Sequence, residues 1–163
     1  MLIGIVSDTH NNSKNIEQII SLFNDKDIEL VIHTGDITNS KSLERFSRLN
    51  VNLIGVYGNN DKNELGLDDV ARKKNFEFQS PPKLVTLSCR RIAIFHEPDD
   101  IENFLARNKD IDIILHGHTH RYRNENKNGT LIFNPGESAG MQKDKNAIGI
   151  VDLQTLEAKR IFF

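Results

Sequence analysis

The sequence predicts an α/β protein in which two β-sheets pack together and helices cover their outer faces. Three observations lead to this prediction. The first half of the chain alternates short β-branched runs with helical periodicity, the second half is mainly short strand-like runs joined by turn signals, and neither a repeat nor a composition shift marks a linker. We therefore expect one domain over residues 1–163, a length that buries a core without disulfides.

The first half of the chain reads as a βαβαβ unit. Strands are predicted over residues 2–6, 30–33 and 53–57, with helices over 13–23 and 41–49 between them. Strands joined by helical crossovers form a parallel sheet, and the loops after their carboxyl ends gather at one edge. Ligands of such sheets bind at that edge, so we expect the functional site there.

The sequence pattern that predicts the remaining elements is weak in the middle of the chain and clear toward its end. Residues 61–83 are hard to interpret: a helix is expected over 65–74, and Ser80-Pro81-Pro82 interrupts any regular element. After this segment the pattern predicts a hairpin of strands 84–87 and 91–95, a helix over 99–108, a buried strand over 111–115, a hairpin of 122–126 and 130–133 across Asn128-Gly129, and a hairpin of 147–152 and 157–162.

Composition favours a soluble globular protein and argues against several functional classes. Hydrophobic residues make up 37% and charged residues 27%, which is typical of a globular protein. The net charge of -2 lacks the excess of basic residues that a dedicated nucleic-acid-binding protein needs. The N-terminal run MLIGIVSDTH lacks a basic start, and no apolar run reaches the roughly 18 residues of a membrane span, so we expect neither an export signal nor an anchor. The single Cys89, in a predicted hairpin turn, favours a reducing, cytoplasmic location.

Side chains that bind metals follow five of the predicted strands, and parallel neighbouring strands would bring them to one edge. These candidate ligands are Asp8, His10, Asp36, Asn59, His96, His118 and His120. Mixed oxygen and imidazole donors suit divalent Mn, Fe, Ni, Co or Zn, and no thiolate takes part. Seven donors exceed the needs of one tetrahedral ion, so two ions sharing a carboxylate are more natural.

Each motif also has a structural interpretation when it is taken alone. Asp8-Thr9-His10 fits a helix N-cap, and Gly35-Asp36 and Gly58-Asn59 are common turn pairs, but their joint position after successive strands favours a site. Two histidines at i and i+2 in Gly117-His118-Thr119-His120 seldom arise from packing.

Four further residues near these motifs are not assigned as ligands. His33 and His116 lie within or at the end of apolar strands, so we interpret them as packed or supporting side chains. Arg121 and Arg123 have two equal explanations, contact with a substrate phosphate or solvation of a strand edge.

The motifs, in their order and spacing, resemble those of calcineurin-like metallophosphoesterases. The resemblance is carried by Asp8-Thr9-His10, Gly35-Asp36, Gly58-Asn59-Asn60-Asp61, His96 after a strand, and Gly117-His118-Thr119-His120, and it runs from Leu2 to about Gly136. The compact size resembles the small bacterial and archaeal phosphodiesterase branch. The resemblance implies a four-layer α/β/β/α sandwich of two mixed sheets.

The resemblance also implies a mechanism and a role for each ligand. One metal is expected at Asp8, His10, Asp36 and His120, and a second at Asp36, Asn59, His96 and His118, with Asp36 as the bridge. Manganese is the first choice for both ions. Asp36, Asn59 and His96 are expected to take part in catalysis, in which a hydroxide bridging the metals attacks the phosphorus of a small phosphodiester.

Three positions depart from the family pattern. Asn60 stands where many relatives have a histidine thought to protonate the leaving group, which favours a diester or activated substrate over a simple monoester. Glu97 follows His96 where relatives usually have glycine and adds negative charge beside the second metal. Glu137 replaces a usual serine after Asn134-Pro135-Gly136, where we expect a role in loop closure.

Two other functional classes compete with the phosphodiesterase interpretation. A subunit of the retromer coat has a similar fold and serves as an interaction scaffold with an impaired metal site, whereas all seven ligand positions remain in this chain. A one-metal hydrolase of amides or esters would leave His96 or Asn59 without a metal. Among protein partners, only a homodimer is considered.

Overall fold

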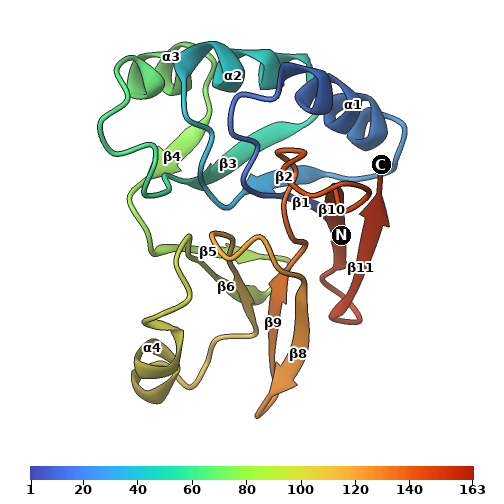
Figure 1. The fold of residues 1–163 in the computed structure, drawn as a ribbon. Helices are drawn as coiled ribbons and strands as arrows, with labels where there is room; N and C mark the ends of the chain where they lie inside the picture. Colours follow the sequence, from blue (N-terminus) through green and yellow to red (C-terminus); the bar gives the residue numbers. More distant parts are fainter.

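The computed structural model describes residues 1–163 and contains two mixed β-sheets and four α-helices (Figure 1). The six strands of the first sheet, in spatial order, are β11 (Glu157–Phe162), β10 (Ala147–Asp152), β1 (Leu2–Val6), β2 (Leu30–His33), β3 (Asn52–Val56) and β4 (Glu77–Gln79). Strands β1 to β4 are parallel to one another, while β10 is antiparallel to both β1 and β11.

The second sheet has five strands and is also mixed. In spatial order these are β5 (Lys83–Leu87), β6 (Arg90–Ile94), β7 (Ile113–Leu115), β9 (Thr130–Asn134) and β8 (Arg123–Lys127). Strands β6, β7 and β9 are parallel, and the hairpins β5–β6 and β8–β9 supply the antiparallel edges. The turn between β5 and β6 is formed by Ser88 and Cys89, as the sequence predicted.

Helices cover the outer face of each sheet, which confirms the predicted four layers (Figure 1). The helices are α1 (Ser13–Asn24), α2 (Ser40–Arg45) and α3 (Leu67–Lys73) over the first sheet, and α4 (Ile101–Arg107) over the second. Strand β1 shows how alternation builds the layers: Ile3 and Ile5 join the cluster between the sheets, while Val6 faces the helices. The second outer cluster packs Ile101 of α4 against Ile114.

Helix α1 follows directly from its sequence. The Asn12 side chain accepts a hydrogen bond from the backbone N–H of Asn15 and so caps the helix. The buried apolar side chains recur at helical spacing and are Ile16, Ile19, Ile20 and Phe23. The helix therefore packs on the sheet along one stripe, close beside the end of β1.

Several elements differ from the sequence-based prediction by one or two residues at their ends, and two differ by more. Helix α2 ends at Arg45, and the rest of the predicted helix is a 3₁₀ turn, Phe46–Arg48. Strand β4 was missed because it is a three-residue edge strand with two exposed side chains, too short to show an alternating pattern. No helix in the structure combines the length and the apolar character that crossing a membrane requires.

Candidate metal centre

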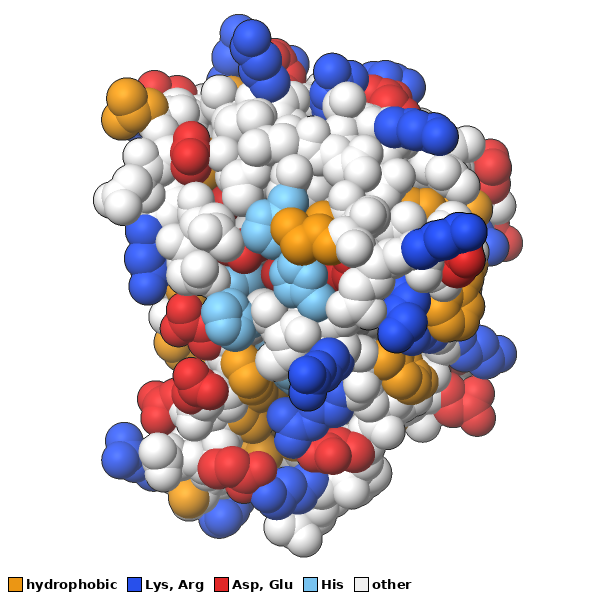
Figure 2. Space-filling view, in the orientation of Figure 1, with side chains coloured by type: hydrophobic (Ala, Val, Ile, Leu, Met, Phe, Trp, Pro, Cys, Tyr) orange, Lys and Arg blue, Asp and Glu red, His pale blue; other side chains and the backbone are white.

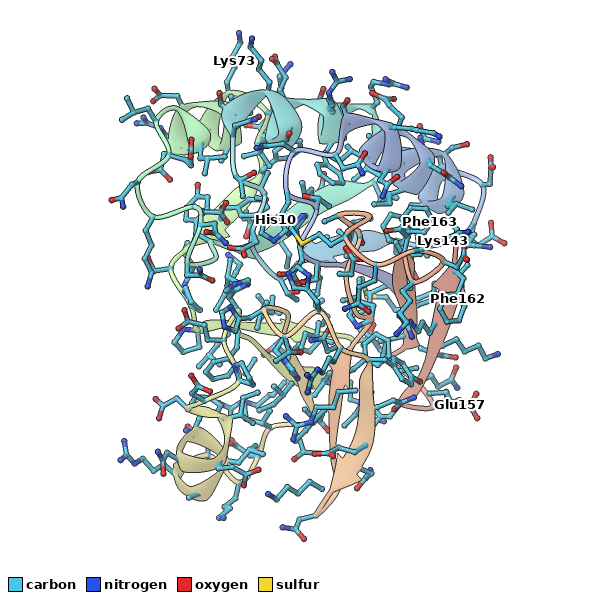
Figure 3. The ribbon with its side chains drawn as sticks, in the orientation of Figure 1. His10, Lys73, Lys143, Glu157, Phe162 and Phe163 are labelled. Carbon is cyan, nitrogen blue, oxygen red and sulfur yellow. The ribbon has the colours of Figure 1, made fainter.

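The seven predicted ligands come together where strand ends of the two sheets meet. Asp8 and His10 follow β1, Asp36 follows β2, and the other four follow β3, β6 and β7. Backbone hydrogen bonds tie these loops together: Asp8 N donates to Gly35 O at 3.0 Å, and Gly117 N donates to His96 O at 3.1 Å. The labelled His10 lies near the middle of the molecule in Figure 3, and Figure 2 shows histidines grouped at the centre of the same face.

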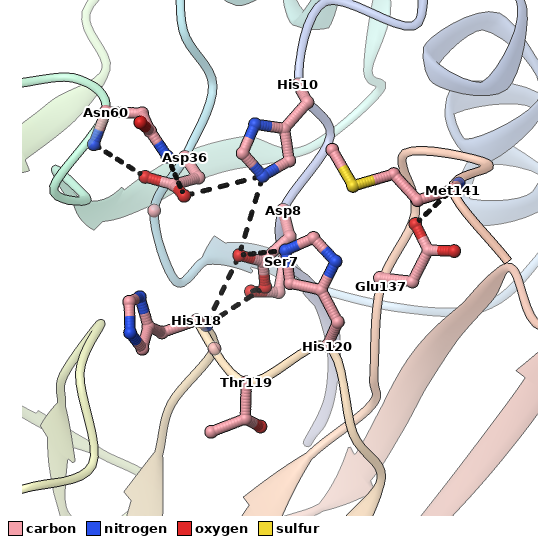
Figure 4. A network of polar contacts seen from close by, with 12 residues as sticks. Ser7, Asp8, His10, Asp36, Asn60, His118, Thr119, His120, Glu137 and Met141 are labelled. Carbon is pink, nitrogen blue, oxygen red and sulfur yellow. Dashed lines mark hydrogen bonds and ion pairs between the residues drawn. The ribbon is translucent and has the colours of Figure 1, made fainter.

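The first set of donors gathers around Asp8, whose side chain is completely buried. His120 Nε2 lies 3.5 Å from Asp8 Oδ1, and His10 Nε2 lies 4.0 Å from the same oxygen. His10 Nε2 is also 3.4 Å from Asp36 Oδ2. Figure 4 shows the two imidazoles turned toward the two carboxylates.

The second set of donors gathers around the amide of Asn59. Its Oδ1 lies 2.9 Å from His96 Nε2 and 3.0 Å from His118 Nδ1. His96 Nε2 is 3.4 Å from Asp36 Oδ1, the carboxylate oxygen that does not face His10. Asp36 therefore turns one oxygen to each set, as a carboxylate does when it bridges two cations through both of its oxygens.

The donor atoms fit divalent cations by three independent features. In two groups of three residues, Asp8, His10 and His120, and Asp8, Asp36 and His96, the donor atoms lie within 4.8 Å of one another. The buried Nε2 atom of His10 has no hydrogen-bond partner. Asp8 and Asp36 are both buried, yet their only ion-pair partners are histidines. Buried carboxylates are costly without a cation, so this site accommodates positive charge.

Electrostatics couples the carboxylates to the imidazoles. Burial acts to raise the pKa of Asp36, but hydrogen bonds from His96 and Asn60 outweigh it and hold the pKa below its ordinary value. The hydrogen bond to Asp8 is the main cause that raises the pKa of His120. For His96, burial opposes protonation, but contact with Asp36 prevails and raises its pKa. The raised pKa values of His96 and His120 favour positive charge beside the two carboxylates.

Neighbouring groups fix the orientation of the candidate ligands. His96 Nδ1 donates a hydrogen bond to Thr34 O at 2.8 Å, which orients the ring so that Nε2 faces Asn59 and Asp36. Asn60 donates twice to Asp36, from its backbone N to Oδ1 at 3.0 Å and from Nδ2 to Oδ2 at 2.7 Å. Ser7 donates a hydrogen bond to Asp8 Oδ2. These contacts hold the donor atoms before any ion arrives.

Most of the candidate ligands have a strained backbone. Five of the seven adopt a positive φ although they are not glycine, namely Asp8 (53°), His10 (38°), Asp36 (60°), His118 (65°) and His120 (55°). A left-handed conformation costs an L-residue roughly 1–2 kcal/mol. Strained backbone of this kind clusters at functional sites, where it holds side chains in the orientation that binding or catalysis needs.

Glycines beside the ligands allow very close approach of neighbouring groups. A Cβ atom at Gly58 would lie 2.1 Å from Asp36 Oδ1, and one at Gly117 would lie 2.0 Å from Ser7 Oγ. No side chain is tolerated at such distances. The Gly-Asn and Gly-His pairs of the sequence therefore reflect packing against the carboxylates as well as turn geometry.

Asp61 organises the site although sequence reasoning did not single it out. Its buried carboxylate accepts four backbone hydrogen bonds, from Asp36 at 2.9 Å, Ile37 at 2.9 Å, Thr38 at 2.7 Å and Gly58 at 2.7 Å. Burial raises its pKa, while the bonds from Gly58 and Thr38 act against this rise. Asp61 thus joins the loop that carries Asp36 to the loop that carries Asn59.

Replacing Asp61 by asparagine should lower the free energy of unfolding by about 2–3 kcal/mol. The reason is that the NH₂ group, which takes the place of one carboxylate oxygen, cannot accept the backbone hydrogen bonds that this oxygen accepts. Urea denaturation followed by circular dichroism measures this change. Glu64→Gln is the matched control, since Glu64 is exposed in the same loop and its side chain makes no hydrogen bond or ion pair. Equal stabilities of the two variants would contradict the organising role of Asp61.

The other residues noted in the sequence have structural surroundings of their own. His33 is completely buried, Nδ1 accepts a hydrogen bond from Gly35 N, and burial lowers its pKa to about 3, so it is packed and neutral. Burial also lowers the pKa of His116 to about 4. Glu137 is buried and accepts hydrogen bonds from the backbone of Met141 and Gln142, which confirms its role in loop closure. Figure 4 shows Met141 of that loop beside His10.

Comparison with known proteins shows which protein family the chain matches. A family model described as the calcineurin-like phosphoesterase superfamily domain matches residues 1–156. The chain is 33% identical over 163 residues to phosphodiesterase MJ0936 of Methanocaldococcus jannaschii, covering 99% of this chain and 98% of that protein.

Solved structures extend the comparison to the fold. The structure of an archaeal phosphodiesterase matches with a TM-score of 0.91 and 32% identity over 100% of both chains. A Vps29 variant from Entamoeba histolytica matches with a TM-score of 0.70 over 100% of this chain and 99% of that one, but at 16% identity this likeness concerns the fold alone.

Proposed function

The chain belongs to the calcineurin-like phosphoesterase superfamily, and from this premise we propose that it hydrolyses small phosphodiesters in a reaction that depends on two divalent metal ions. The observation that carries the proposal is Asp36, whose two oxygens face two different sets of donors, His10 on one side and His96 on the other. The likeness to a relative named phosphodiesterase supports the choice of substrate.

We assign the ligands according to the two sets. Asp8, His10, Asp36 and His120 would hold one ion, and Asp36, Asn59, His96 and His118 would hold the other. The donors suit manganese, which we propose as the native ion, and also iron, nickel, cobalt and zinc. When bound, such ions lower the pKa of a water molecule and neutralise charge on a phosphoryl group.

The residues of the chain orient the reacting groups. Asn59 directs Oδ1 toward the imidazoles of His96 and His118, which leaves Nδ2 to donate to a phosphoryl oxygen. Asn60 holds the Asp36 carboxylate with two hydrogen bonds, so its amide is an orienting group. Because this amide cannot donate a proton as an acid, Asn60 does not assist the leaving group. Diesters and activated esters are therefore favoured over simple monoesters.

We further propose that residues 1–163 act as one catalytic domain in the cytoplasm. The continuous cluster of 14 buried residues between the sheets, drawn from both halves of the chain, supports a single cooperative unit. The exposed free thiol of Cys89 supports a reducing compartment.

The experiment is hydrolysis of bis(4-nitrophenyl) phosphate beside 4-nitrophenyl phosphate, with metal-free protein to which manganese is added. Both esters release the same phenolate, so a difference in rate reflects the difference between a phosphodiester and a phosphomonoester. We expect kcat/KM to be higher for the diester and turnover to disappear with a chelator. If neither ester is hydrolysed with manganese, nickel, cobalt, zinc or iron, the enzyme proposal fails and the scaffold alternative is favoured.

A further inference from the structure

A cavity of about 590 Å³ opens beside the second set of donors. Its walls come from two segments, the loop before α4 with Pro98 and Asp99, and the segment after β7 that runs from His116 to Arg123. His118 belongs both to the donor set and to the cavity wall. The cavity therefore adjoins the donor set and is within reach of one ester arm of a phosphodiester bound there.

Positive charge predominates in the walls of the cavity. Arg121 is exposed, and its guanidinium forms no hydrogen bond or ion pair within the chain; only its backbone N is engaged, by Thr119. Arg123 is bound to Glu125, and Asp99 is the single acidic side chain of the wall. The unpaired guanidinium of Arg121 is thus the group left to meet a ligand, and Figure 2 shows basic side chains next to the histidines.

The wall beside Arg121 is held in place by packing. The ring of Tyr122 contacts Phe133 edge-on at a centroid distance of 6.2 Å, and the guanidinium of Arg160 lies 5.1 Å from the Tyr122 ring. His116 also lines the cavity, is 1% exposed, and has an Nε2 atom without a hydrogen-bond partner. A concave site that presents a few polar groups free to bind is where ligands usually bind.

We propose that this cavity selects phosphodiesters in which one ester arm ends in an anionic group, a carboxylate or a phosphate, and that Arg121 is the residue that determines this specificity. The proposal rests on the phosphodiesterase function proposed above. Arginine suits the role because its planar fork binds either anion through two parallel hydrogen bonds. The bond that breaks remains the one at the central phosphorus, and the anionic group of the arm takes no part in the reaction.

Three diesters with the same 4-nitrophenolate leaving group test the proposal, with ethyl, 2-carboxyethyl and 2-phosphoethyl arms. In the manganese-loaded protein we expect kcat/KM for the better anionic ester to exceed that for the ethyl ester about tenfold, as charge-assisted hydrogen bonds allow. The two anionic esters distinguish a carboxylate from a phosphate. The preference should weaken at high salt, because Arg121 is exposed to solvent.

Variants at Arg121 distinguish a loss of substrate specificity from a loss of catalytic activity toward all three esters. Arg121→Ala should lower kcat/KM for the anionic ester about tenfold more than for the ethyl ester, and Arg121→Lys should keep part of the preference. Arg107→Ala is the control, since Arg107 is exposed on α4 outside the cavity lining and should leave all three rates unchanged.

Two outcomes separate this inference from the proposed function. Hydrolysis of the ethyl ester at a rate equal to that of both anionic esters, or an equal loss for all three in Arg121→Ala, would overturn the specificity proposal while leaving the phosphodiesterase intact. No hydrolysis of any diester with metal present would overturn the proposed function, and the specificity proposal with it.

Discussion

Asparagine in place of Asp36 should lower kcat/KM for bis(4-nitrophenyl) phosphate by at least about 10³-fold, since both the metal centre and its electrostatic effect depend on this carboxylate. Asn keeps the size of the side chain and removes its charge. One of the two oxygens, 3.4 Å from His10 Nε2 or 3.4 Å from His96 Nε2, becomes an NH₂ group that cannot bind a cation. Steady-state kinetics with manganese measures the loss.

Asp27→Asn is the matched control for Asp36→Asn. Asp27 is exposed and forms no ion pair, so the same loss of one negative charge there should leave kcat/KM unchanged. A cooperative melting transition of Asp36→Asn would show that the variant is folded. If the folded variant kept its activity within a factor of ten of the wild type, Asp36 would not be the shared ligand.

Manganese added to the metal-free protein should raise Tm by about 5–10 °C when the free ion is at a hundred times its Kd. The physical reason is that only the folded chain holds the donors together: they come from five loops between residues 8 and 120, and an unfolded chain separates them. Differential scanning calorimetry at several metal concentrations measures the shift. Magnesium, which prefers an all-oxygen octahedron, should give a smaller shift.

The number of bound ions distinguishes the competing interpretations. Metal content after gel filtration should approach two ions per chain, and Asp36→Asn should lose both the ions and the Tm response. One ion per chain would favour the one-metal hydrolase. A Tm that does not respond to manganese, iron, nickel, cobalt or zinc would favour a scaffold that folds without metal.

The sequence predicted the architecture because the strands carry strong local signals. Buried runs such as 2–6 and 30–33 are separated by an amphipathic helix, and these patterns are local along the chain. Strand β4 has no such pattern: it is placed by pairing with β3 and by contact of Phe78 with Tyr57. Its position is therefore a consequence of tertiary structure.

The sequence also indicated the candidate ligands, because each one stands just after a strand. The supporting residues were harder to find. Asp61 was noted only as the last residue of the Gly58-Asn59-Asn60-Asp61 motif, because an acidic residue in a turn has the same local signature whether it faces water or accepts four backbone hydrogen bonds. From the sequence, Asn60 stands out only as a residue that cannot protonate the leaving group. Its hydrogen bonds to Asp36 depend on the geometry of two loops, which no local sequence pattern encodes.

The position of β1 in the middle of its sheet has a consequence for biosynthesis. This strand leads directly to Asp8 and His10, and it pairs on one side with the early β2 and on the other with the late β10. A ribosome releases the chain from its N-terminus, so β10, Ala147–Asp152, emerges after every candidate ligand has been made. Until then β1 is an open sheet edge, and the nascent chain carries all seven donors without the strand that completes their frame. The sheet frame that holds the seven candidate ligands is therefore completed only after β10 has been synthesised.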